Sequence, residues 1–97
     1  MDDAKLYLIF LDVFNANYET LTRRAALVAS GNSNSIYVGD YTNYTVQLFI
    51  SNGWRQGIDP PAQINKLLNA IVCKCCQDSG VNAAAEWSDD MEYIYFT

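Results

Sequence analysis

The chain has 97 residues, of which 51% are hydrophobic and 18% charged, and its formal net charge at pH 7 is −5. A chain of this length forms one domain, and a composition this apolar excludes a disordered protein. No apolar run reaches the roughly 18 residues of a transmembrane helix, and the N-terminal "MDD" lacks the basic residues of a signal peptide. We therefore expect one globular domain over residues 1–97, located in the cytoplasm.

The first apolar run, "KLYLIFLDVF" at 5–14, predicts a strand buried on both faces. A helix that begins at Asp2 is the alternative, because a short apolar run has no decisive period. A helix is expected next over 17–31, with Asn17 as its N-terminal cap and Gly31 as its end.

The segments "SIYV" (35–38) and "YTVQLFIS" (44–51) predict a hairpin across "GDYTN". In the second of these strands, alternate residues would face opposite sides of the sheet, with Phe49 on the side away from Tyr44. The glycine-containing stretch 52–59 that follows predicts a loop in which Trp54 is partly exposed.

The second helix has the clearest pattern in the chain. Asp59 is expected to cap it, Pro60 is tolerated in its first turn, and Gly80 is expected to end it. Its core-facing stripe has helical spacing and consists of Ile64, Leu67, Leu68, Ile71, Val72 and Cys75. A second hairpin, 81–87 and 91–96 joined by "SDD", completes the chain.

These elements predict an α+β fold in the order β-α-β-β-α-β-β, a ferredoxin-like antiparallel sheet with two helices on one face. With a leading helix the order becomes α-α-β-β-α-β-β. The open sheet face would expose Phe49 together with either the Tyr93 and Tyr95 pair or the Ile94 and Phe96 pair, unless a partner covers them.

All three cysteines fall within residues 73–76. On a helical wheel Cys75 lies at the centre of the apolar stripe, Cys76 at its edge and Cys73 on the polar side, so the three sulfurs cannot bind one metal. The C-x-x-C pair lies near a helix C-terminus, where the dipole disfavours thiolates. We expect no metal site and no cofactor, and a redox role for Cys73 is the weaker alternative.

Little else in the sequence suggests catalysis. The chain has no histidine, no phosphate-binding loop and no dinucleotide fingerprint. The basic, glycine- and aromatic-rich motif of RNA-recognition domains is also missing. We expect a protein that is not an enzyme and has no catalytic residues.

The whole net charge lies at the C-terminal end. Residues 1–74 hold six acids and six bases, whereas residues 75–97 hold five acids and no base. An acidic segment repels nucleic acid and attracts basic protein surfaces. We therefore expect no direct nucleic-acid or membrane binding, and a protein partner with a basic surface. The predicted partner-binding residues are the acidic and aromatic ones near this end and in the loop: Trp54, Glu86, Trp87, Asp89, Asp90, Glu92, Tyr93 and Tyr95.

In size and charge the chain is similar to small acidic, non-catalytic inhibitors such as phage-encoded anti-CRISPR proteins. The similarity is limited to these general properties and involves no sequence motif. It implies docking on a nucleic-acid-handling protein in the host cell cytoplasm. The alternative hypothesis is a homodimeric structural or ligand-binding domain that associates through Phe49 and Tyr95.

Overall fold

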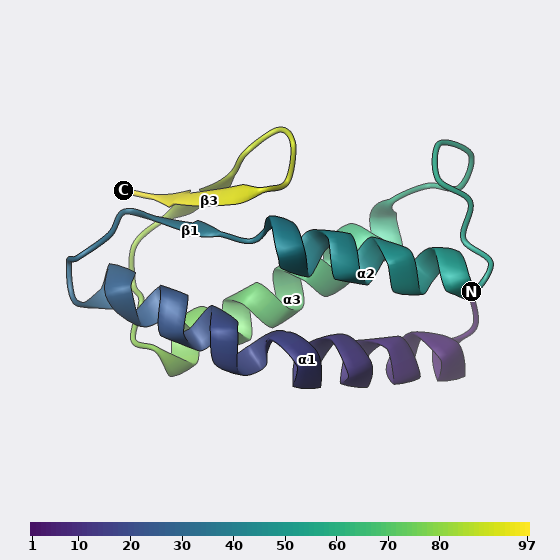
Figure 1. The fold of residues 1–97 in the computed structure, drawn as a ribbon, viewed down its shortest axis with the longest axis horizontal. Helices are drawn as coiled ribbons and strands as arrows, with labels where there is room; N and C mark the ends of the chain where they lie inside the picture. The colour runs from purple at the N-terminus through teal and green to yellow at the C-terminus, as the bar shows by residue number, and fades with distance from the viewer.

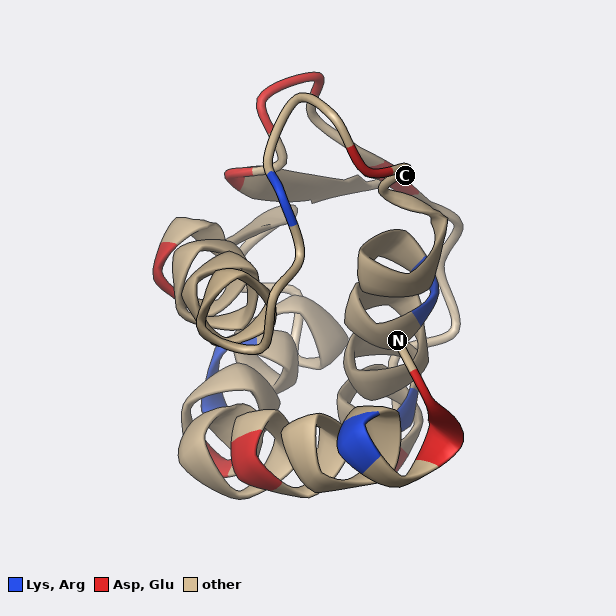
Figure 2. Cartoon of the chain, turned by 90° about the vertical axis from the view of Figure 1, so that its right-hand side faces the viewer, with Lys and Arg blue, Asp and Glu red and all other residues tan.

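The structure is a computed structural model that describes all 97 residues. It confirms an α+β protein, but one with three helices and a small antiparallel sheet. In chain order its elements are α1 (Asp3–Ala29), β1 (Ser35–Tyr37), α2 (Gly39–Ser51), α3 (Ala62–Asp78), β2 (Ala85–Trp87) and β3 (Tyr93–Phe96). The sheet lies over α2 and α3, the N-terminal half of α1 lies on the far side, and the C-terminal end of α1 reaches β1 (Figures 1 and 2). None of the helices is long and apolar enough to cross a membrane.

The strand predicted over 5–14 is wrong, and the alternative of a leading helix is correct. The Asp2 carboxylate accepts the Lys5 N–H at 2.8 Å and caps a helix that continues to Ala29. Ile9 and Val13 face the core while Leu11 between them is exposed, which fits a helix, since all three would share one face of a strand. Asn17 is therefore no cap; it lies inside α1, where its side chain donates to the Val13 carbonyl.

The strand predicted over 44–51, and with it the first hairpin, is also wrong. This segment belongs to α2, in which Tyr41, Thr45 and Phe49 form a buried stripe with a spacing of four. The apparent alternation arose because Val46, Leu48 and Ile50 add apolar residues outside that stripe. Phe49 is fully buried and is not available for self-association.

The helix predicted before the cysteines is confirmed as α3, and all six residues of its expected stripe are buried. Gly80 has a positive φ of 78°, as expected of the residue that ends a helix. Asp59 does not cap α3. Its carboxylate instead accepts the backbone N–H of Arg55 at 2.7 Å and closes the preceding loop.

The sheet has the order β1-β3-β2, and both strand pairs are antiparallel. The predicted C-terminal hairpin is confirmed for 85–87 with 93–96, whereas 81–84 is not strand. The ferredoxin-like order with two helices is not found, since the chain runs α-β-α-α-β-β. Ile36, Ile94 and Phe96 face the helices and join the core, so the opposite sheet face is the one left uncovered.

Candidate functional site

The uncovered sheet face carries three neighbouring tyrosines from two strands. Tyr37 of β1 lies opposite Tyr93 of β3, and Tyr95 lies two residues further along β3 on the same face. The ring centroids of Tyr37 and Tyr93 are 5.3 Å apart in an edge-on arrangement, and those of Tyr93 and Tyr95 are 6.2 Å apart and stacked. The three side chains are 41%, 39% and 51% exposed, respectively. We call Tyr37, Tyr93 and Tyr95 the tyrosine row.

Acidic side chains border the tyrosine row on the β2 side and at the hairpin turn. Glu86 of β2 pairs with Tyr95 across the strands and therefore shares its face, and Glu92 directly precedes β3. Neither carboxylate has a salt-bridge partner within the chain, and both residues are exposed. Figure 2 shows acidic ribbon segments gathered around the sheet end of the molecule. The face is therefore aromatic and negative.

The turn at Ser88–Glu92 fixes the hairpin that carries this face. The Ser88 hydroxyl donates to the Asp90 carboxylate at 2.6 Å, and the Glu92 N–H donates to the same oxygen at 3.0 Å. These two hydrogen bonds hold the pKa of the Asp90 carboxyl below its usual range. The Thr42 hydroxyl of α2 donates to the Met91 carbonyl at 2.8 Å and ties the turn to the helices. Asp90 therefore holds the turn, whereas Asp89 lies exposed in the same turn.

Arg24 of α1 supports the Tyr37 end of the row. Its guanidinium lies 5.6 Å from the centroid of the Tyr37 ring and donates to the Tyr37 carbonyl at 2.6 Å. The same guanidinium donates two hydrogen bonds of 3.0 Å to the Asp40 carboxylate and forms an ion pair with it. These bonds hold the pKa of the Asp40 carboxyl below its usual range. Because Arg24 is paired in this way, it adds no free positive charge to the sheet face.

The structure brings together only part of the predicted partner-binding set. Glu86, Tyr93 and Tyr95 share the outward face, and Asp89, Asp90 and Glu92 lie in the adjoining turn. Trp87 faces the other way: it is half-buried and packs against the core. Sequence reasoning missed Tyr37, because it paired 35–38 with 44–51. The alternation of Ser35, Ile36, Tyr37 and Val38 was the signal that Tyr37 faces outward.

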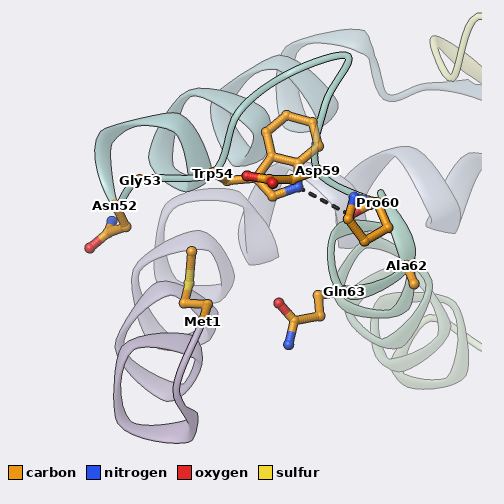
Figure 3. A pocket seen from close by; sticks show the side chains of 8 residues that line it. All are labelled: Met1, Asn52, Gly53, Trp54, Asp59, Pro60, Ala62 and Gln63. Carbon is orange, nitrogen blue, oxygen red and sulfur yellow. Dashed lines mark hydrogen bonds between the residues drawn. The ribbon is translucent and has the colours of Figure 1, made fainter.

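Trp54 does not join the face. It lies in the loop after α2, a helix of 13 residues that separates the loop from β1 by about 20 Å. Its indole N–H donates to the Pro60 carbonyl at 3.1 Å, and the side chain borders a pocket with Met1 and Gln63 (Figure 3). The one carboxylate of that pocket, Asp59, is hydrogen-bonded to Arg55, which holds its pKa below the usual range. This pocket therefore offers no free acid–base pair.

The cysteines occupy the positions that the helical wheel predicts. Cys75 is buried, Cys76 is half-buried and Cys73 is exposed. Burial raises the pKa of the Cys75 thiol to about 11, and it also raises that of Cys76. No three Cys, Asp or Glu side chains are grouped so that they could hold a metal ion.

We expect thiol labelling to follow this order of burial. A maleimide reagent should modify Cys73 in the folded protein, Cys76 more slowly, and Cys75 only after unfolding, because the thiolate is the reactive form and burial disfavours it. Mass spectrometry of labelled peptides over time gives the three rates, with a denatured sample as the control. If Cys75 reacts as fast as Cys73 in the folded protein, the packing of α3 described here is wrong.

Gly39 is expected to control the position of Tyr37. A Cβ at residue 39 would lie 2.5 Å from the Tyr37 hydroxyl oxygen and 2.7 Å from the adjacent ring carbon. Gly39→Ala should therefore displace the Tyr37 ring from its present position against Tyr93. The gain in helix propensity, at most about 1 kcal/mol, keeps overall stability close to that of the wild type.

Nuclear Overhauser effects between the Tyr37 and Tyr93 rings measure this shift. They should weaken in Gly39→Ala and persist in Asn43→Ala, which raises helix propensity at an exposed position one turn further along α2. Unchanged contacts between the rings in Gly39→Ala would contradict the placement of Tyr37.

A comparison of the chain with protein-family models, curated proteins and solved structures finds no match.

Proposed function

We propose that this protein is a non-catalytic binding module whose sheet face docks on a basic surface of another protein. The observation that carries the proposal is the tyrosine row itself: three adjacent, half-exposed rings on a face that no other element covers, bordered by carboxylates without partners. Tyrosine is enriched in interface hot spots because it adds a large apolar area and a hydrogen-bonding group at low entropic cost.

The chemistry of the face favours arginine or lysine on the partner. A guanidinium can stack on a tyrosine ring while a neighbouring carboxylate neutralises its charge, as Arg24 does with Tyr37 and Asp40 within the chain. Tyr95 beside Glu86 offers the same combination to an external cation. An acidic face of this kind repels a phosphate backbone, so the proposed partner is a protein.

The narrower form of the proposal is an inhibitor of the phage-encoded, anti-CRISPR type. In that form the basic surface is the nucleic-acid site of a host protein, and the acidic face competes with the nucleic acid for it. This form adds one requirement, namely that nucleic acid and this protein exclude each other from the partner.

The proposal is tested by capture with matched variants. Tagged wild-type protein is incubated with cell lysate, eluted with a salt gradient, and its bound proteins are identified by mass spectrometry. We expect a basic partner that elutes at moderate salt, since salt screens exposed charges. Against that purified partner, Tyr95→Ala should weaken binding by about 30-fold, the effect of a hot-spot aromatic, and Glu86→Gln by a few-fold.

Two variants remote from the sheet serve as controls. Tyr7→Ala removes an exposed tyrosine and Glu19→Gln an exposed carboxylate, both on α1. Binding of the purified partner should not change with either. If Tyr95→Ala and Glu86→Gln bind as tightly as the wild type, the sheet face is not the docking surface.

Self-association through the sheet face is the less favoured alternative. Tyr95 is exposed as that hypothesis requires, but Phe49 lies in the core. Two copies stacked face to face would bring the Glu86 and Glu92 carboxylates of both into one interface without a base, which costs free energy. A second copy therefore needs a different surface.

A further inference from the structure

The N-terminal half of α1 is apolar on both sides. Ile9 and Val13 face the core, while Leu8 and Leu11 on the opposite side remain 65% and 37% exposed, with Tyr7 beside them at 63%. An amphipathic helix of a monomeric domain normally presents polar residues on that side. This half of α1 lies at the edge of the molecule away from the sheet (Figures 1 and 2).

The exposed residues have the spacing of a helix–helix seam. Ala4, Leu8, Leu11 and Asn15 are separated by four, three and four residues, and all four are exposed. This alternation is the heptad pattern by which one helix packs against another. We call these four residues the α1 seam.

The charges beside the seam are self-complementary. Lys5 and Asp12 are the only charged residues between positions 4 and 15, both are exposed, and they lie seven residues apart on the same flank. If a second copy packs antiparallel, with Leu8 against Leu11 of that copy, then Lys5 of each molecule faces Asp12 of the other. In a parallel arrangement Lys5 and Asp12 would instead face the flank that carries Tyr7 and Phe14, so no ion pair would form.

Both side chains are available for this pairing. Lys5 makes no salt bridge within its own chain. One oxygen of Asp12 accepts the Tyr44 hydroxyl at 2.6 Å, which orients the carboxylate and leaves its other oxygen free. The flank therefore presents one fixed acid and one unpaired base.

We propose that a second copy of this chain packs antiparallel on the α1 seam and forms a symmetric dimer with two Lys5–Asp12 ion pairs. The overlap covers twelve residues, about 18 Å of helix, so the interface is at the small end of specific interfaces and depends on concentration. The inference does not rest on the proposed function. The two sheet faces would point away from each other, which would make the dimer bivalent toward a partner.

Sedimentation velocity over a wide range of protein concentrations tests the dimer. The wild type should pass from 10.9 kDa to twice that mass as its concentration rises. Leu8→Glu should remain a monomer throughout, while far-ultraviolet circular dichroism shows that it is folded. A wild-type protein that stays monomeric, or a dimer that survives Leu8→Glu, overturns the proposal.

A charge exchange tests the antiparallel pairing. Lys5→Glu and Asp12→Lys should each weaken the dimer by about ten-fold at low salt, because each places like charges opposite each other twice. An equimolar mixture of the two variants should restore association to within a few-fold of the wild type, since every facing pair is then opposite in charge. Restoration in the mixture is specific to an antiparallel contact between these two residues.

Matched controls separate this pairing from a general effect of charge. Glu19→Lys makes the same change in net charge as Asp12→Lys but lies outside the overlap, so by itself it should dimerise as tightly as the wild type. Asp12→Asn removes the charge but can keep the hydrogen bond to Tyr44, so it replaces Asp12→Lys if that variant does not fold, with a few-fold loss expected. If the Lys5→Glu and Asp12→Lys mixture associates no better than either variant alone, the proposed register is wrong.

Discussion

Phe49→Ala is expected to lower the free energy of unfolding by about 3–5 kcal/mol, the largest effect of any single change considered for this protein. Phe49 is fully buried on the inner face of α2, within the same core cluster as Tyr41 and Ile71. Truncation removes the favourable burial of the ring and leaves a cavity that the surrounding helices cannot fill. Small domains are stable by only about 5–15 kcal/mol, so this substitution should remove a large part of the free energy of unfolding.

Urea denaturation followed by circular dichroism measures this loss. Tyr95→Ala is the matched comparison, because Tyr95 is also aromatic but lies half-exposed on the sheet; its cost should stay below about 1 kcal/mol. A Phe49→Ala variant as stable as Tyr95→Ala would contradict the helical assignment of residues 39–51. The pair thus distinguishes α2 from the strand that the sequence pattern favours.

The second large effect is a loss of stability at alkaline pH, caused chiefly by Tyr41. The Tyr41 side chain is fully buried, and its hydroxyl donates to the Leu68 carbonyl of α3 at 2.7 Å. Burial raises the pKa of Tyr41 far above its ordinary value of about 10. Burial of the Cys75 thiol raises its pKa to about 11 and acts in the same direction.

The sign follows from proton binding. In the folded state these groups keep their protons at pH values where the unfolded chain has released them. Their contribution to the free energy of unfolding is therefore complete below the pKa that each group has in the unfolded chain, and it is lost as the pH rises above that value. We expect the decline to begin near pH 9 with Cys75, and Tyr41 to add about 1.4 kcal/mol per pH unit above pH 10.

Denaturation curves from about pH 8 to pH 11 test this prediction in the presence of a reductant. Tyr41→Phe should cost about 1 kcal/mol at the lower pH, the worth of one hydrogen bond, and should show a shallower decline above pH 10. Tyr7→Phe, at an exposed tyrosine of α1, should decline as the wild type does. Equal slopes for Tyr41→Phe and the wild type would mean that Tyr41 does not carry the effect.

The candidate site was predictable in part. The acidic and aromatic character of the C-terminal hairpin is a local property of residues 85–96, and the structure places Glu86, Tyr93 and Tyr95 on one face, as strand alternation requires. Tyr37 was not predictable in this way, because it reaches Tyr93 through a pairing between segments more than fifty residues apart. Trp87 and Trp54 could not be excluded from the site by composition, since the direction of an aromatic side chain depends on what packs beneath it.

The features that depend on one helix or one hairpin alone could be predicted from the sequence. Six apolar residues at helical spacing define α3, and with them the burial order of the three cysteines. The secondary structure of residues 5–14 and 44–51 depends on their packing in the folded chain, because their apolar side chains lie on every side and fit a strand and a helix equally well. The choice comes from packing: as helices, these segments bury Ile9, Val13, Tyr41 and Phe49 in one core against α3. That packing leaves the sheet face and the outer side of α1 uncovered, and these are the two surfaces to which we assign binding.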